Sequence, residues 1–85
     1  MTKLEQKLIE LGYEQSKLIK EFYEKKFNYT YITIYINPNS TIKDEWCGVQ
    51  RKGLRHFQQK EQIKELDKAF NQMQKDLKIL KECEE

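Results

Sequence analysis

Thr30-Tyr31-Ile32-Thr33-Ile34-Tyr35-Ile36 is the stretch that decides the fold of this 85-residue chain. β-branched and aromatic residues crowd it, which is typical of a strand, and residues 27–42 around it carry no charge. In an extended strand, alternate side chains point to opposite faces of the sheet. The stretch therefore predicts an isoleucine face, formed by Thr30, Ile32, Ile34 and Ile36, and a tyrosine face, formed by Tyr29, Tyr31, Thr33 and Tyr35.

The segments on both sides of this strand are expected to complete a small antiparallel sheet. Residues 37–40, Asn-Pro-Asn-Ser, predict a turn, because proline fixes φ and asparagine side chains bond to their own backbone. Residues 42–50 then predict a third strand. Residues 17–25 are expected to form the first strand, since an isolated hairpin is only marginally stable. The apolar spacing in residues 14–26 is also compatible with a helix, and this alternative stays open.

A helix is expected at each end of the chain. Residues 3–11 place three leucines on one face, and Thr2 with Glu5 has the spacing of an N-terminal capping box. Gly12 then supplies the left-handed residue that commonly ends a helix. Residues 59–82 lack glycine and proline, and their apolar positions recur at intervals of three and four. This stripe consists of Ile63, Leu66, Phe70, Met73, Leu77 and Leu80, flanked by Ala69 and Ile79.

These elements predict one α+β domain, residues 1–85, in the order α-β-β-β-α. Its three strands form an antiparallel meander, and the long C-terminal helix packs on the isoleucine face, which needs an apolar cover. The tyrosine face is either covered by the first helix, through Leu4, Leu8 and Leu11, or exposed. The stripe of the last helix also permits self-association, so that a monomer and a homodimer both remain open.

Composition narrows the class of protein. Charged residues make up 35% of the chain, and the formal net charge is +2. This near balance disfavours both a wholly basic nucleic-acid coat and an acidic DNA mimic. No apolar run approaches the roughly 20 residues that span a bilayer, and the N-terminus lacks the apolar core of a secretory signal. We therefore expect a cytoplasmic protein of a host cell, without a membrane partner, whose Cys47 and Cys83 are free thiols.

The chain offers few residues for catalysis or metal binding. His56 is the only histidine, and the three glycines are scattered, so that no phosphate-binding loop or nucleophile-elbow motif is present. Cys47, His56 and Cys83 lack the close pairing that is usual for zinc ligands. We expect no enzymatic activity, no metal site and no cofactor.

Positive charge gathers in residues 51–60, which we call the basic window. It carries four positive charges and no negative one, and it includes both arginines of the chain. Arginine presents a planar fork of donors that suits phosphate and carboxylate. The basic window is therefore a candidate surface for anions of a nucleic acid or a protein, or else a solvated loop whose charges balance the acidic positions of the last helix. Its candidate residues are Arg51, Lys52, Arg55, His56 and Lys60.

The tyrosine face is the second candidate surface. Aromatic rows on a sheet can stack unpaired bases, although the glycine-rich aromatic signature of RNA-recognition modules is missing from this chain. Tyrosine is also a favoured anchor at protein interfaces, because it is amphipathic and has few torsions to freeze. The candidate residues are Tyr29, Tyr31 and Tyr35.

Three stretches carry a resemblance to a known group of proteins. They are KLEQKLIELGY at residues 3–13, KKFN at residues 25–28 and LDKAFNQMQKDL at residues 66–77. Together they resemble short, uncharacterised accessory proteins of bacteriophages and prophages of Gram-positive bacteria, although the basic window matches poorly. The resemblance implies a helix, a small antiparallel sheet and a long closing helix. None of the stretches is a catalytic motif, so that no functional residue is carried over from the group.

The resemblance also implies a function, since small phage accessory proteins often bind and block host proteins. We hypothesise a non-enzymatic protein that binds a bacterial protein partner, such as a nucleic-acid-binding defence effector, and inhibits host defence as an anti-CRISPR protein does. The basic window would contact acidic groups of the partner, with exposed tyrosines beside it. The alternative is a small nucleic-acid-binding protein that uses the same residues.

Overall fold

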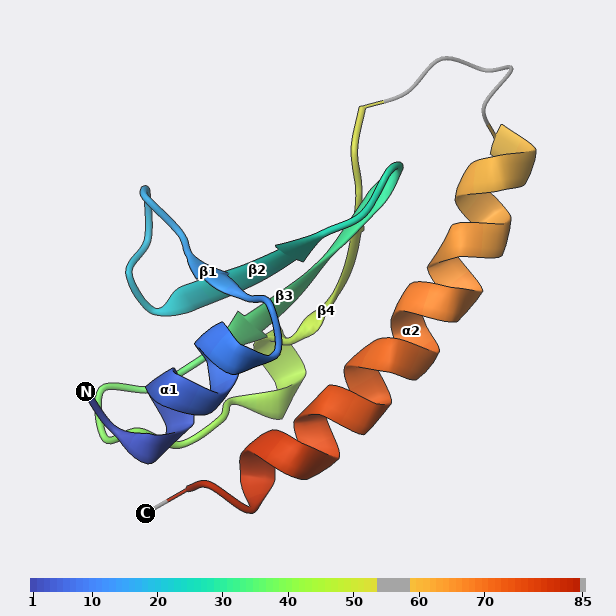
Figure 1. Ribbon diagram of the computed structural model, residues 1–85. Helices are drawn as coiled ribbons and strands as arrows, with labels where there is room; N and C mark the ends of the chain where they lie inside the picture. Colours follow the sequence, from blue (N-terminus) through green and yellow to red (C-terminus); the bar gives the residue numbers. More distant parts are fainter. Residues whose placement is uncertain (54–58, 85) are drawn as a thin grey trace.

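A four-stranded antiparallel sheet and two helices make up the computed structural model, which describes residues 1–53 and 59–84 (Figure 1). The sheet order β1-β2-β3-β4 follows the chain. This arrangement is the α+β class that the sequence predicts, with one strand more than expected. The elements are α1 (Lys3–Glu10), β1 (Glu14–Gln15), β2 (Phe22–Lys26), β3 (Thr30–Tyr35), the 3₁₀ helix η1 (Asp44–Trp46), β4 (Gly48–Arg51) and α2 (Gln59–Lys81).

The strand β3 lies in the interior of the sheet, and its alternation is as predicted. Ile32 and Ile34 are fully buried, and the register places Tyr23 of β2 directly opposite Ile34. Tyr31 and Tyr35, which point to the other face, are only half-buried. The isoleucine face is therefore the core side of the sheet.

Both helices pack on the isoleucine face. Leu4 and Leu8 of α1 belong to the same buried cluster as Ile34 of β3 and Leu80 of α2. The long helix α2 runs along the whole sheet, and α1 lies near its C-terminal half (Figure 1). Neither helix covers the tyrosine face, which answers the question that the sequence left open.

The ends of α1 follow the predicted chemistry. The hydroxyl of Thr2 accepts a hydrogen bond from the N–H of Glu5 at 3.1 Å and donates to the Glu5 carboxylate at 3.3 Å. After the helix, Gly12 adopts φ +95°, a left-handed conformation that suits glycine. The turn at Gly12 lets the next residue, Tyr13, point into the core, where it is 2% exposed.

The β1–β2 connection is a loop, so that the expected strand over residues 17–25 is wrong in its first half. The hydroxyl of Ser16 accepts hydrogen bonds from the N–H groups of Leu18 and Ile19 at 3.2 and 3.3 Å. These bonds fold the segment back on itself, which leaves Leu18 and Ile19 exposed and delays the start of β2. The two residues before the loop form β1, the strand that the sequence pattern did not predict.

The connection between β3 and β4 replaces the continuous third strand that was expected over residues 42–50. Ile42 makes a single antiparallel bridge with Ile36. The chain then turns into η1, because the N–H of Trp46 donates to the carbonyl of Lys43 at 3.0 Å. As a result β4 is only four residues long, and Trp46 lies outside the strands.

The predicted apolar stripe of α2 is confirmed at Met73, Leu77 and Leu80, which are buried, and is wrong in other positions. Ile63 and Phe70 are 58% and 51% exposed, and Ile79 also faces solvent. Gln62 and Asp76 are buried instead, and each side chain hydrogen-bonds to a group outside the helix. The helix turns this mixed face to the sheet because the sheet side supplies partners for these polar groups.

The packing predicts that substitution of isoleucine by alanine lowers the stability strongly at one position and hardly at another. Ile34→Ala removes a fully buried side chain and should lower the free energy of unfolding by about 2–5 kcal/mol. Ile63→Ala, at an exposed position of α2, should change it by no more than about 0.5 kcal/mol. Urea denaturation followed by circular dichroism measures both. A large loss for Ile63→Ala would mean that α2 turns its predicted stripe, rather than its observed face, to the sheet.

Candidate functional site

Glu65 ties α2 to the turn between β2 and β3. Its Oε1 accepts a hydrogen bond from the N–H of Asn28 at 3.1 Å. Its Oε2 accepts from the N–H of Tyr29 at 2.7 Å and from the hydroxyl of the buried Thr30 at 2.8 Å. Hydrogen bonds to an ionised carboxylate are stronger than those between neutral groups, so that this contact fixes the N-terminal half of α2 on the sheet.

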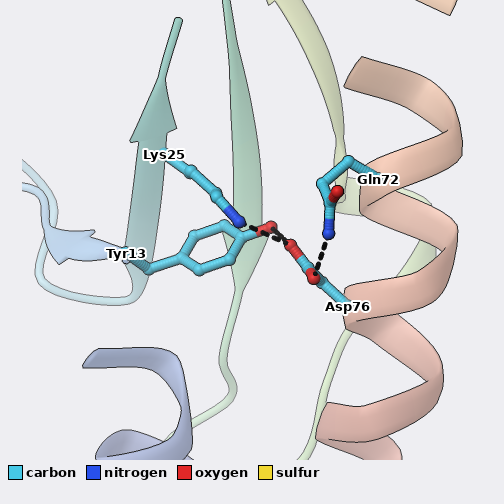
Figure 2. A network of polar contacts seen from close by, with 4 residues as sticks. All are labelled: Tyr13, Lys25, Gln72 and Asp76. Carbon is cyan, nitrogen blue, oxygen red and sulfur yellow. Dashed lines mark hydrogen bonds and ion pairs between the residues drawn. The ribbon is translucent and has the colours of Figure 1, made fainter. Parts of the chain in front are cut away.

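Asp76 ties the C-terminal half of α2 to the sheet (Figure 2). Its Oδ2 accepts a hydrogen bond from the Tyr13 hydroxyl at 2.8 Å and lies 3.3 Å from the Lys25 Nζ. Its Oδ1 accepts from the amide of Gln72 at 2.9 Å. Asp76 is 1% exposed, and burial of a carboxylate is costly unless donors replace water. The three donors replace water around the carboxylate, so that the network stabilises the packing of α2 on the sheet.

The face of the sheet opposite the helices, which we call the open face, has no described helix over it. Its side chains lie in three rows set by the antiparallel register. The rows are Glu14, Glu24, Thr33 and Gly48; Phe22 and Tyr35; and Lys26, Tyr31 and Gln50.

Aromatic rings extend one end of the open face, the row of Phe22 and Tyr35, toward η1. The rings of Phe22 and Tyr35 are 5.0 Å apart between centroids and meet edge to face at 77°. Tyr35 and Trp46 repeat this geometry at 4.8 Å and 62°, and the Lys43 Nζ lies 4.2 Å from the Trp46 ring centroid. Such edge-to-face pairs and the cation–π contact favour one orientation of the rings. The open face therefore carries an ordered aromatic ladder.

A groove of about 320 Å³ lies beside this ladder. Phe22, Tyr31 and Trp46 contribute aromatic lining, and Leu18 and Ile19 of the β1–β2 loop contribute aliphatic lining. Leu18 is 95% exposed. Apolar side chains that cluster on a surface, rather than occurring singly, are characteristic of interaction sites.

The described members of the basic window lie on different elements. Arg51 and Lys60 are exposed, but they lie on β4 and α2 respectively. Lys52 is half-buried, and its Nζ donates to a backbone carbonyl in the β2–β3 turn. Arg55 and His56 lie outside the described residues. Of the described members, Arg51 and Lys60 are therefore the ones left for contacts with a partner.

The three candidate tyrosines separate into two places. Tyr31 and Tyr35 lie on the open face, as predicted. Tyr29 lies before β3, in the turn that Glu65 binds, and it lines a shallow groove with Lys64 of α2. Its predicted place on the tyrosine face is wrong because the strand alternation begins only at Thr30.

The open face also contains residues that the sequence did not single out as a site. Phe22 and Trp46 were expected in strands, without a binding role, and Glu24 was not distinguished from other carboxylates. The period-2 pattern of β2 carries a signal for Phe22 and Glu24, because both alternate with the buried Tyr23. Trp46 has no such signal, since η1 interrupts the strand pattern.

The cysteines and carboxylates form no metal centre among the described residues, where no group of three or more His, Cys, Asp or Glu is close enough to hold an ion. Cys47 and Cys83 are free. The sulfur of Cys47 accepts from the N–H of Tyr35 and donates to the carbonyl of Lys43, both at 3.4 Å. Burial raises the pKa of the Cys47 thiol, which favours its neutral form.

Comparisons of the chain with protein-family models, with curated proteins and with solved structures find no match. Within residues 1–53 and 59–84, no helix has the length and apolar content required to cross a membrane.

The Asp76 network predicts a specific response to alkaline pH. Burial, and then the hydrogen bond to Asp76, raise the pKa of Tyr13 above its ordinary value. Above a pH of about 10, unfolded tyrosine releases a proton that folded Tyr13 keeps, so that the free energy of unfolding falls as pH rises. Tyr13→Phe removes the hydroxyl that donates to Asp76, and it should lower the free energy of unfolding by about 1–2 kcal/mol at neutral pH.

Urea denaturation of both proteins from pH 8 to pH 11 tests this prediction. The difference in stability between wild type and Tyr13→Phe should narrow above pH 10, by at most about 1.4 kcal/mol per pH unit. Other titrating groups are common to both proteins and cancel in the difference. A difference that stays constant over the whole range would show that Tyr13 ionises as freely in the folded protein as in the unfolded one.

Proposed function

We propose that this chain is a non-enzymatic phage or prophage accessory protein that binds a bacterial protein partner through the open face of its sheet and thereby inhibits a host defence system. The position of the binding surface is inferred from the aromatic groove on the open face, which Phe22, Tyr31 and Trp46 line together with Leu18. The phage setting and the inhibition of defence rest on the resemblance of residues 3–13, 25–28 and 66–77 described above.

The physical argument is one of surface composition. Aromatic side chains anchor protein interfaces because they bury a large area at a low cost in conformational entropy. Trp46 and Tyr35 are already held by ring contacts, so that little further ordering is needed when a partner binds. Arg51, exposed at the end of β4, is paired with Thr30 and therefore belongs to the helix side of the sheet, so that the open face itself supplies the contacts of the proposal.

Capture from a bacterial lysate, with matched variants, tests the proposal. Trp46 and Phe70 are 50% and 51% exposed, but Trp46 lines the groove on the open face, whereas Phe70 lies on α2 and lines a separate groove. Immobilised wild type and Phe70→Ala should retain the same protein from a lysate of a Gram-positive bacterium. Trp46→Ala should retain at least about tenfold less, as expected for an interface anchor that contributes about 1.4 kcal/mol or more.

Quantitative mass spectrometry of the eluates measures the retained protein, and circular dichroism checks that each variant is folded. The proposal fails if no retained protein depends on Trp46. It fails equally if Phe70→Ala is the variant that loses the partner, because the binding surface would then lie on α2.

The second candidate function is direct binding of nucleic acid. The observation that favours it is the position of the half-buried Tyr31 and Tyr35 on a face of the sheet that no described helix covers, where bases can stack. Such binding through phosphate contacts weakens steeply as salt increases. Filter-binding titrations with single- and double-stranded DNA and RNA, at two salt concentrations, distinguish the candidates. Absence of binding at the lower salt concentration removes the nucleic-acid candidate.

A further inference from the structure

Among the described residues that line the groove on the open face, Glu24 is the one with a charged side chain. The other lining groups are aromatic rings, aliphatic side chains and uncharged polar groups. Glu24 lies in the central row of the face, directly opposite Thr33 of β3. A charge beside apolar walls is screened less by water than one on an open polar surface, so that it interacts more strongly with a bound ion.

Glu24 forms no ion pair with a described lysine or arginine. The ion pairs between described residues are Lys7–Glu10, Lys25–Asp76 and Lys81–Asp44. Lys17 and Lys26 line an adjacent polar groove, which Glu24 also borders, but neither lines the aromatic groove. Glu14 of β1 stands directly opposite Glu24, and like charges at opposed positions of a sheet repel each other. The aromatic groove therefore contains one negative charge, that of Glu24, and no described positive charge lines it.

We propose that the groove receives an apolar segment of the protein partner that carries an arginine, whose guanidinium group binds the Glu24 carboxylate. This inference rests on the proposed function and specifies the chemistry of the partner. A bound cation at this place also relieves the repulsion between Glu24 and Glu14.

Arginine fits the groove better than lysine does. Its planar guanidinium group can bind a carboxylate through two parallel hydrogen bonds, and it is more weakly hydrated than an ammonium group. The same plane stacks on aromatic rings, which Tyr31 and Trp46 provide in the lining. Leu18 and Ile19, on the loop side of the groove, would contact the apolar neighbours of the arginine.

A pair of synthetic peptides that mimic the proposed segment tests the inference. Acetyl-Leu-Arg-Leu-amide and its citrulline counterpart have nearly the same shape, but only the first is charged. Each is titrated into ¹⁵N-labelled protein, and the backbone amide resonances are followed by NMR, which detects millimolar binding. The arginine peptide should shift the resonances of Glu24, Thr33 and Gly48 and should bind roughly fivefold more tightly than the citrulline peptide.

Two variants complete the experiment. Glu24→Gln should abolish the preference for arginine, whereas Glu61→Gln, at an exposed position of α2, should retain it. Equal affinities for the two peptides, shifts confined to α2, or no shifts with either peptide would each overturn the inference. Equal binding of both peptides at the open face leaves the proposed function standing. Failure of that function is recognised separately, by capture of the partner that does not depend on Trp46.

Discussion

The buried carboxylate of Asp76 is the constraint on which the rest of the structure depends. It is 1% exposed and must keep its hydrogen bonds to Tyr13 and Gln72 and its ion pair with Lys25, because an unpaired charge in the core is costly. Its donors come from the start of the sheet as well as from α2 itself. Together with the contact of Glu65 to the β2–β3 turn, the network fixes the rotation of α2 and its position along the sheet. Because these contacts hold α2 on the isoleucine face, the opposite face of the sheet is left without a described helix over it.

The parts of the fold that local patterns could predict are those governed by local physics. The alternation of Ile32 and Ile34 identifies the core strand, and the Thr2–Glu5 capping box and Gly12 delimit α1. The apolar periodicity of α2 predicts the burial of Met73, Leu77 and Leu80 but not that of Asp76, because it counts a carboxylate as a surface residue. The buried position of Asp76 depends on donors more than fifty residues away in the chain.

The candidate surface could be predicted from the sequence only in part. The strand pattern places Tyr31 and Tyr35 on one face, but whether a helix covers that face depends on the direction of the chain after α1. The exposed Leu18 and Ile19 result from the Ser16 turn, and Trp46 joins the aromatic ladder only because η1 interrupts the strand. The basic window is contiguous in sequence, whereas its described members lie on different elements.

The central claim is that the open face, rather than α2, is the surface that binds a partner. Hydroxyl-radical labelling of the aromatic side chains, read by mass spectrometry in the free protein and in the complex with its captured partner, tests it most directly. Labelling of Trp46 and Tyr31 should fall in the complex, while labelling of Phe70 should stay unchanged. Protection of Phe70, with Trp46 labelled as in the free protein, would contradict the claim.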